Sequence, residues 1–235
     1  MSVEFFGLPG SGKSYLCESL GKQLAGRDMQ IDGCAHPPVD LQPRLRLHLI
    51  KQSSAWRFAI RHPVLASRIV RIIQRSGQAS KRHVVTKSIN LFAELTRCEK
   101  FRNRLVSEQG VLQAIWSVAL RARRPVIDDL VTLALPWLPT IIVQVDVDRA
   151  EHLRRLDERE GGRSRLDRME GQALSEELDR GAVLLAEIVR SCERLVPSAQ
   201  WHRVENLSNR DSFQVLRPVI EAISESLGNR TQPSS

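Results

Sequence analysis

An eight-residue stretch near the start of the chain, GLPGSGKS at residues 7–14, constrains the fold more than any other feature. It matches the pattern GxxxxGK[ST], follows the apolar run 3–6 and precedes Leu16, Leu20 and Leu24 at helical spacing. Glycines let such a loop wrap so that its N–H groups point at phosphate oxygens, and the helix N-terminus adds partial positive charge. The sequence therefore predicts a strand, a phosphate-binding loop and a helix.

Individual loop residues have expected roles. Lys13 is expected to reach the β and γ phosphates of a nucleoside triphosphate, and the Ser14 hydroxyl is expected to ligate Mg²⁺. The residues predicted to bind the nucleotide are Gly7, Pro9, Gly10, Ser11, Gly12, Lys13, Ser14 and Tyr15. The expected cofactors are ATP and Mg²⁺, with the preference for ATP over GTP left open.

The rest of the chain alternates between strand-like and helical patterns. Further strands are predicted at residues 29–33, 104–107, 140–147 and 200–204, with helices between them and a last helix to about residue 227. This alternation predicts an α/β fold: three layers around a doubly wound, mostly parallel sheet of about five strands. One domain spanning residues 1–235 is expected, with a helical insertion at 39–100 broken at Pro63 and near Gly77, and a disordered tail at 228–235.

Positive charge is concentrated in the helical insertion. The net charge of the chain is +8, yet residues 42–104 hold fifteen Lys or Arg against Glu94 and Glu99, which gives that segment +13. Such a field attracts anions, and the alternatives are a phosphorylated substrate, nucleic acid, an acidic membrane surface or only solvent. The arginines Arg57, Arg61, Arg68, Arg71 and Arg75 are predicted to form one helical stripe.

Other sequence features exclude several classes of protein. Cys17, Cys34, Cys98 and Cys192 are widely spaced without a CxxC pair, which predicts reduced thiols rather than a disulfide or zinc framework. The start of the chain has no basic signal region and no apolar run reaches the roughly 18 residues of a membrane span, so a cytoplasmic protein is expected. The four tryptophans, Trp56, Trp116, Trp137 and Trp201, lie in apolar contexts and are predicted to be core residues.

Two acidic pairs compete for the metal-binding role, and Asp128 and Asp129 could imitate the acidic end of a Walker B strand. Asp128 and Asp129 lie only about ten residues before the 140–147 strand, which barely leaves room for a crossover helix, so a helix start is favoured there. Asp146 and Asp148 end that strand and are predicted to serve as turn and N-cap residues.

A phosphate-binding loop by itself fits a small-molecule kinase, a motor ATPase or a GTPase switch. No NKxD-like motif, which would indicate the base specificity of a GTPase, follows a later strand. Motor ATPases are usually larger than this chain and carry a sensor apparatus. A small kinase fits best.

The chain resembles the nucleoside and nucleotide kinase group of P-loop proteins, in particular thymidylate-kinase-like and deoxynucleoside-kinase-like sequences. GLPGSGKS is the specific part of this resemblance, and the order of elements extends it over most of the chain. In that group a carboxylate-bearing loop follows the third strand, which implies that Glu108 is the base for the acceptor hydroxyl or a magnesium ligand. Ser107 stands where an Asp is common. The alternative for Glu108 is a carboxylate at a helix N-terminus.

The same resemblance implies an arginine-rich lid at residues 155–168. Arg155, Leu156 and Arg159 match the RLxxR spacing of such lids, and Arg163 follows in a glycine-rich loop. By resemblance, Arg155 covers the nucleotide base while Arg159 and Arg163 approach the phosphates, where they stabilise the charge of the transferred group. Solvated i, i+4 pairs of Glu and Arg are the alternative.

The resemblance also places the acceptor site between the second strand and the helical insertion. The candidate acceptor residues are Asp32, Arg44, Arg46, Arg97 and Arg102. No DRx triplet or other substrate signature of a thymidylate or deoxynucleoside kinase is present, so the acceptor stays open.

The favoured hypothesis is therefore an ATP- and magnesium-dependent phosphotransferase acting on a small hydroxyl- or phosphate-bearing acceptor. The rival is a nucleotide-switched accessory ATPase that docks on nucleic acid or an acidic membrane surface through residues 42–104. A kinase acting on a polynucleotide end and a homodimer both remain open.

Overall fold

The computed structural model describes residues 1–25, 29–32, 41–101, 104–158, 169, 171–205 and 212–228, with side chains for all of these except residues 32, 41–48, 227 and 228. Within these residues one parallel sheet has the strand order β2-β3-β1-β4-β5. Its strands are β1 (Ser2–Phe6), β2 (Gln30–Asp32), β3 (Leu105–Ser107), β4 (Ile141–Asp146) and β5 (Gln200–Glu205). The predicted doubly wound parallel sheet is confirmed.

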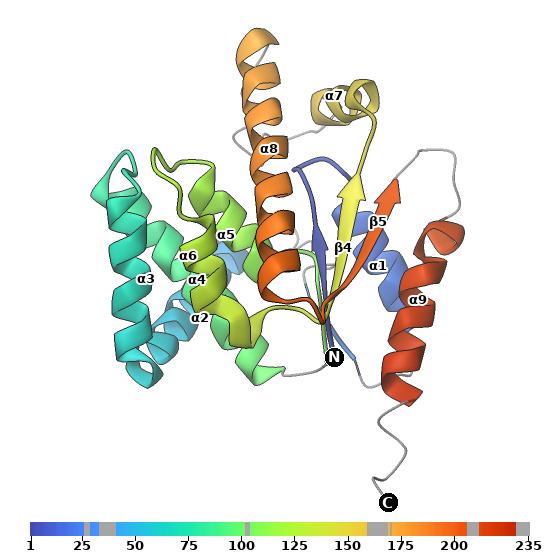
Figure 1. Cartoon of the computed structure of the whole chain (residues 1–235), viewed down its shortest axis with the longest axis horizontal. Helices are drawn as coiled ribbons and strands as arrows, with labels where there is room; N and C mark the ends of the chain where they lie inside the picture. Colours follow the sequence, from blue (N-terminus) through green and yellow to red (C-terminus); the bar gives the residue numbers. More distant parts are fainter. Residues whose placement is uncertain are drawn as a thin grey trace, which may run out of the picture.

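Helices cover both faces of this sheet, as Figure 1 shows. One side carries α1 (Lys13–Gln23) and α9 (Ser212–Gly228). The other side carries α2 (Leu41–Arg61), α3 (Pro63–Arg75), α4 (Lys81–Lys100), α5 (Val111–Ala119), α6 (Ile127–Ala134) and α8 (Gly171–Leu195). A 3₁₀ turn, η1 (Leu135–Trp137), follows α6, and α7 (Arg149–Asp157) lies beyond the end of β4.

The two cores follow from the alternation of side chains along the strands. Val3 and Phe5 of β1 are buried in the cluster with α1 and α9, whereas Phe6 is buried in the cluster with α4, α5 and α8. Successive residues of a strand point to opposite faces, so an apolar strand can fill both cores. This explains why the central strands β1 and β4 are mostly apolar.

The strand order decides where a ligand can bind. β1 is central, with β3 on one side, where Val3 pairs with Val106, and β4 on the other, where Val3 pairs with Ile141. Because the chain turns to opposite sides of β1, the carboxyl ends of β1, β3 and β4 meet at a switch point of the sheet, where ligands of open α/β folds bind.

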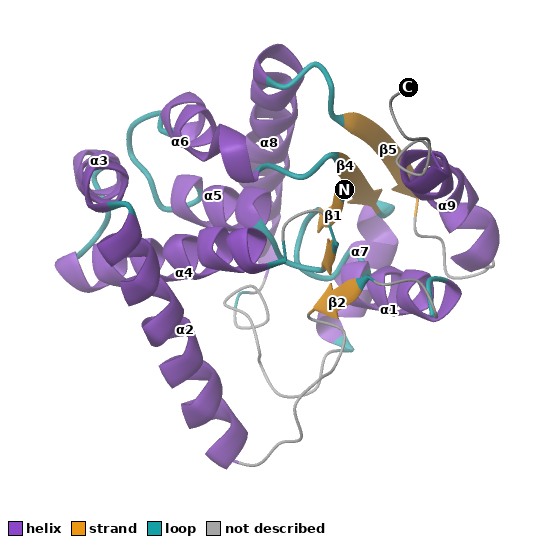
Figure 2. Ribbon diagram, turned by 90° about the horizontal axis from the view of Figure 1, so that it is seen from below, coloured by secondary structure: helices purple, strands orange, loops and turns teal. Residues whose placement is uncertain are grey.

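The predicted helical insertion forms α2, α3 and α4, with breaks at His62 and around Gly77. α2 packs on α4, where the Phe58 ring stacks on the Phe92 ring with centroids 5.2 Å apart, and Ala55 and Phe58 are both buried. Figure 2 shows the N-terminal half of α2 extending away from the other helices. The prediction that all four tryptophans lie in the core is wrong for Trp56, which is 70% exposed because it lies on the side of α2 away from α4.

Three smaller expectations hold in the structure. α6 begins at Ile127, so Asp128 and Asp129 occupy its first turn, as predicted. Of the four cysteines, Cys17, Cys98 and Cys192 are free, and Cys34 lies outside the described residues. Over the part of the chain that the structure describes, no helix is both long and apolar enough to cross a bilayer.

Candidate active site

The phosphate-binding loop joins β1 to α1 at the carboxyl edge of the sheet. Gly10 and Gly12 have φ angles of 96° and 89°, in the left-handed region that side chains other than glycine rarely adopt. A Cβ on Gly7 would lie 2.6 Å from the carbonyl oxygen of Val145 in β4. The glycines are therefore required by backbone conformation at two positions and by close packing at a third.

Lys13 is held inside this loop although it is charged. Its Nζ donates hydrogen bonds to the carbonyl oxygens of Gly7, at 2.9 Å, and Leu8, at 2.7 Å, and the residue is only 6% exposed. A buried ammonium needs such partners because leaving it unpaired is costly. The ammonium thus lies against the loop backbone, beside the N-terminus of α1.

Ser14 and Glu108 are in direct contact. Ser14 Oγ donates a hydrogen bond of 2.5 Å to Glu108 Oε1, although 94 residues separate them in the sequence. Glu108 directly follows β3, and β3 is the neighbour of β1. The sheet order therefore brings the candidate base and metal residue to the first turn of α1.

These two oxygens suit a magnesium ion. Mg²⁺ prefers hard oxygen ligands and usually keeps water and substrate phosphates in its shell, so few protein ligands are needed. Among the described residues, no group of three or more His, Cys, Asp and Glu could hold a metal by itself. A site made of Ser14, Glu108, phosphate and water fits this chain better than a protein-only cage.

Helix α7 contacts the loop from the β4 side. Asp148 caps α7 by accepting from the amides of Ala150, at 2.9 Å, and Glu151, at 3.3 Å, which confirms its predicted N-cap role. Arg155 donates from Nη1 to the carbonyl oxygen of Ser11, at 3.3 Å, and from Nε to Glu151. Arg155 thus lies on the phosphate-binding loop, while Arg159 and Arg163 lie outside the described residues.

His152, which no sequence motif predicted to be a site residue, also contacts the phosphate-binding loop. The residue is 4% exposed, and its Nε2 lies 2.6 Å from the carbonyl oxygen of Pro9. Burial, followed by the nearby charges of Lys13 and two arginines, lowers the pKa of His152, while the Pro9 carbonyl opposes this shift. A neutral imidazole donating from Nε2 to Pro9 is the state that fits this environment.

On the other side, Arg97 of α4 reaches the loop that carries Glu108. Its guanidinium donates to the carbonyl oxygen of Gln109 and pairs with Glu94. Arg97 is therefore next to the predicted acceptor side. The other candidates are not placed: Arg102 and the side chains of Asp32, Arg44 and Arg46 lie outside the described residues.

Glu4 is a second residue that sequence reasoning missed, because it lies within an apolar strand. It is 2% exposed and accepts hydrogen bonds from the amides of Leu112, at 3.2 Å, and Gln113, at 2.9 Å, in the first turn of α5. Burial raises its pKa to about 7, although the two amides and Arg97 oppose this. A Cβ on Gly110 would lie 2.5 Å from the Glu4 carboxyl group. Glu4 therefore anchors the segment that follows Glu108.

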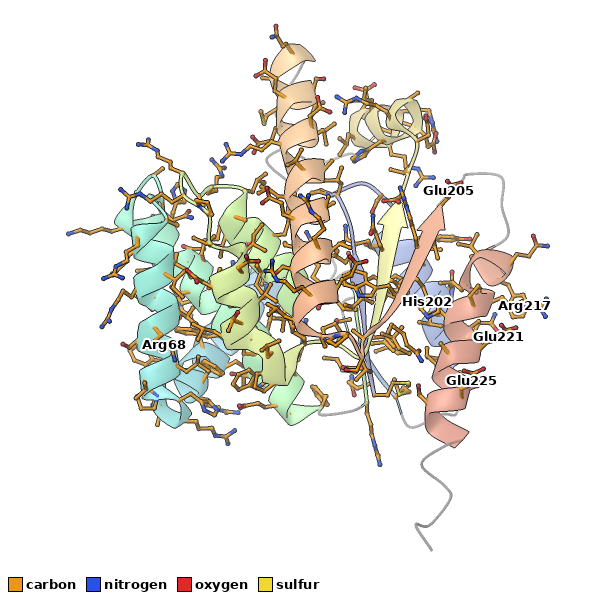
Figure 3. All side chains as sticks on the ribbon, viewed as in Figure 1. Arg68, His202, Glu205, Arg217, Glu221 and Glu225 are labelled. Atoms are coloured by element: carbon orange, nitrogen blue, oxygen red, sulfur yellow. The ribbon has the colours of Figure 1, made fainter. Side chains whose placement is uncertain are left out.

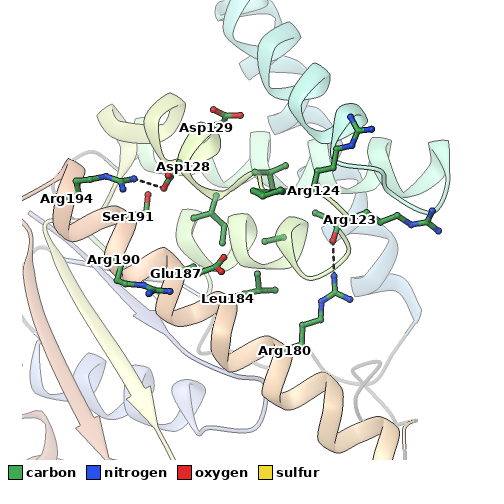
Figure 4. A pocket seen from close by; sticks show the side chains of 15 residues that line it. Arg123, Arg124, Asp128, Asp129, Arg180, Leu184, Glu187, Arg190, Ser191 and Arg194 are labelled. Atoms are coloured by element: carbon green, nitrogen blue, oxygen red, sulfur yellow. Dashed lines mark hydrogen bonds and ion pairs between the residues drawn. The ribbon is translucent and has the colours of Figure 1, made fainter.

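A hollow of about 720 Å³ lies elsewhere, between α8 and the connection from α5 to α6 (Figure 4). Arginines contribute much of its lining, but two of them are already engaged. Arg194 pairs with Asp128 at 2.8 Å, and Arg180 donates to the carbonyl oxygen of Ala122 at 2.9 Å. None of the loop residues 7–14 lines this hollow, so it is distinct from the candidate site.

A central β1, the glycine loop that follows it and the strand order define the class of this fold: a three-layer α/β fold with a parallel sheet and a phosphate-binding loop between β1 and α1. No protein-family model and no curated protein sequence matches the chain. Solved structures do match it over almost the whole length.

Two kinases represent these structural matches. A deoxyadenosine kinase from M. mycoides with bound dATP superposes with a TM-score of 0.53 at 14% identity, covering 95% of this chain and 100% of that chain. The same enzyme with bound products gives 0.52 at 11% identity. Thymidylate kinase from Candida albicans gives 0.50 at 12% identity, covering 95% of this chain and 91% of that chain. The resemblance to this kinase group is thus confirmed at the level of the fold.

Proposed function

We propose that this protein is a kinase that moves the γ-phosphoryl group of Mg·ATP to a small acceptor bearing a hydroxyl or phosphate group. The observation that carries the proposal is the contact of 2.5 Å between Ser14 Oγ and Glu108 Oε1. It joins a phosphate-loop hydroxyl to a carboxylate at the edge of the sheet. Such a pair is what phosphoryl transfer needs near the γ-phosphate.

In the proposed reaction an acceptor oxygen attacks the γ-phosphorus while the bond to the bridging oxygen of ADP breaks. With a hydroxyl acceptor, the proton passes to the Glu108 carboxylate. Lys13 and the loop amides hold the β and γ phosphates, and the Ser14 hydroxyl would ligate Mg²⁺, which neutralises phosphate charge when bound. The alternative role for Glu108, as a magnesium ligand, uses the same position.

Arginines are proposed to complete the site on two sides. Arg155 contacts the phosphate-binding loop at Ser11, so we assign it to the phosphate side. Arg159 and Arg163 follow it in the chain, and we retain them as candidates for the charge of the transferred group. Arg97, which contacts Gln109, is proposed to face an anionic acceptor.

The decisive experiment follows label from the γ-phosphate of Mg·ATP into pools of nucleosides, nucleotides, sugars and oligonucleotides. Lys13→Ala and Glu108→Gln are expected to reduce transfer by about a hundredfold or more, since a positioned base alone contributes that much. Glu221→Gln, a carboxylate that pairs with Arg217 on α9, is the matched control and is expected to retain activity.

Two further outcomes are informative. If Glu108→Gln raises the Mg²⁺ concentration needed for half-maximal activity, Glu108 acts on the metal; a loss of kcat at saturating Mg²⁺ assigns it as the base. Label released only as free phosphate, with no acceptor in any pool, would contradict the kinase and favour a nucleotide-switched ATPase.

A further inference from the structure

The outer surface of α2 and α3 combines two features that are unusual together. The first is the absence of carboxylates: residues 41–93 contain no Asp or Glu. Lys51, Arg57, Arg68, Arg71 and Arg75 are exposed along this stretch. In Figure 3, Arg68 is labelled on α3, on the side of the molecule opposite to α9. The helices that form this surface therefore carry basic side chains and no acidic side chain that could neutralise them.

The second feature is a cluster of exposed apolar side chains. Five of the ten large apolar residues that are exposed in the described structure lie between residues 49 and 64. Trp56 is 70% exposed, and Ile60 and Val64 are each 74% exposed. Leu49 and Ile50 extend the cluster, at 61% and 59% exposure.

The helical spacing places three of these side chains on one side of α2, whereas Val64 lies at the start of α3. Trp56 and Ile60 are four residues apart, and Leu49 precedes Trp56 by two turns, so they share a face. Ala55 and Phe58 point the opposite way and are buried. Arg57 and Arg61 lie along one edge of the exposed apolar face, and Arg61 also pairs with Glu99 of α4 at 3.8 Å. We call residues 49–75 the α2–α3 surface.

The other side of the molecule is different. On α9, Arg217 pairs with Glu221 at 2.9 Å, and Glu225 follows one turn later (Figure 3). Ordinary solvent-facing helices mix charges in this way. The α2–α3 surface carries positive charges without negative ones between them, and this indicates a negatively charged partner.

Three kinds of partner can be compared by their chemistry. A second copy of the same surface would bring arginines against arginines, which is repulsive. Nucleic acid satisfies the arginines and can stack on Trp56, but it gives little to the aliphatic Leu49, Ile60 and Val64. A bilayer with anionic headgroups satisfies both features, because Trp and aliphatic side chains enter the interface while Arg and Lys contact the headgroups.

We infer that the α2–α3 surface docks this protein on the surface of an anionic lipid bilayer. Trp56, Ile60 and Val64 enter the headgroup region, and Arg57 and Arg68 contact lipid phosphates. α2 packs on α4, which carries Arg97, so a docked molecule would have the proposed acceptor side next to the helices that touch the lipid. The inference does not depend on phosphotransfer, because it concerns binding alone.

The test uses the full chain and large vesicles of phosphatidylcholine, with or without about 30% phosphatidylglycerol, in sedimentation assays. We expect binding only to the anionic vesicles, and weaker binding when NaCl is raised from about 0.1 M to about 0.5 M. Tryptophan emission should shift to the blue on binding, and this shift should be lost in Trp56→Phe. Trp116 is 5% exposed and Trp137 and Trp201 are half-buried, so these three tryptophans provide the background emission in both proteins.

Two variant pairs separate the contributions. Trp56→Gln with Ile60→Gln should weaken vesicle binding by about tenfold or more, whereas Val183→Gln, a 58% exposed residue on α8, should not. Arg57→Glu with Arg68→Glu should also weaken binding by about tenfold or more, whereas Arg124→Glu should not. All of these positions are exposed, and thermal unfolding of each variant verifies that it is folded.

Three results would overturn the inference. One is equal binding, or no binding, to neutral and anionic vesicles. Another is binding to oligonucleotides that needs Arg57 and Arg68 while vesicle binding is absent, which would assign the surface to nucleic acid. The third is a dimer, detected by light scattering, that Trp56→Gln with Ile60→Gln dissociates, which would assign the surface to a second copy of the chain.

Discussion

Glu4 shows how one residue can link the stability of the fold to pH. Its carboxyl group is buried on β1 with a pKa raised to about 7 from an ordinary 4.5, chiefly by burial, and the carboxylate of Glu94 adds to the shift. The folded protein therefore keeps a proton that the unfolded chain has released between these two pH values. Stability must then fall as pH rises through that window.

We expect the free energy of unfolding to decrease by about 3 kcal/mol between pH 4.5 and pH 7.5 from this group alone. Denaturant unfolding of wild type and Glu4→Gln at both pH values measures it, because the difference between the two proteins isolates Glu4 from other titrating groups. A Gln side chain has no proton to lose, so the variant should show a smaller pH dependence. The same pH dependence in both proteins would rule out this role.

The residues of the candidate site differ in how well the sequence alone predicts their roles. Lys13 and Ser14 are legible from the sequence because one contiguous motif contains them. Glu108 could be proposed from its place after a strand, but its contact with Ser14 depends on β3 lying beside β1. His152 and Glu4 carry no motif. The one available signal for Glu4 is a carboxylate within an apolar strand, where a charge needs buried partners.

Helix α7 is an element whose position depends on its first turn. Asp148 accepts two amide hydrogen bonds there, and the same helix carries His152 and Arg155 to the phosphate-binding loop. Asp148→Ala should lower the free energy of unfolding by about 1 kcal/mol, whereas Asp148→Asn should retain most of the cap. Denaturant unfolding tests this, and equal stability of the Ala and Asn variants would contradict it.

Helix α2 shows that a helical sequence pattern does not tell which face of the helix is buried. Its apolar residues predict a helix correctly, but they lie on two faces, and periodicity cannot tell which face α4 covers. The core prediction therefore failed at Trp56. α6 is the opposite case. The short connection before β4 barely left room for a strand at Val126 and Ile127 followed by a crossover helix, and it correctly favoured a helix start at Asp128 and Asp129.

At the scale of the whole molecule, nucleotide binding should stabilise the fold. A ligand present at about a hundred times its Kd stabilises the folded state by about 2.7 kcal/mol, which corresponds to an increase in Tm of roughly 5–10 °C for a chain of this size. A thermal scan with and without Mg·ATP measures this shift. Lys13→Ala should abolish most of it, and an equal shift in that variant would place the nucleotide elsewhere.

The sequence by itself determined the phosphate-binding loop, the α/β class, the order of strands along the chain and the basic helical segment. These follow from local requirements: positive φ at Gly10 and Gly12, and the periods of strand and helix. Only the tertiary structure decided the neighbours of β1, the meeting of Ser14 with Glu108, the burial of Glu4 and the exposure of Trp56. The physical reason is that each of these depends on which distant segments pack together, and a local pattern constrains a residue's conformation but not its partner.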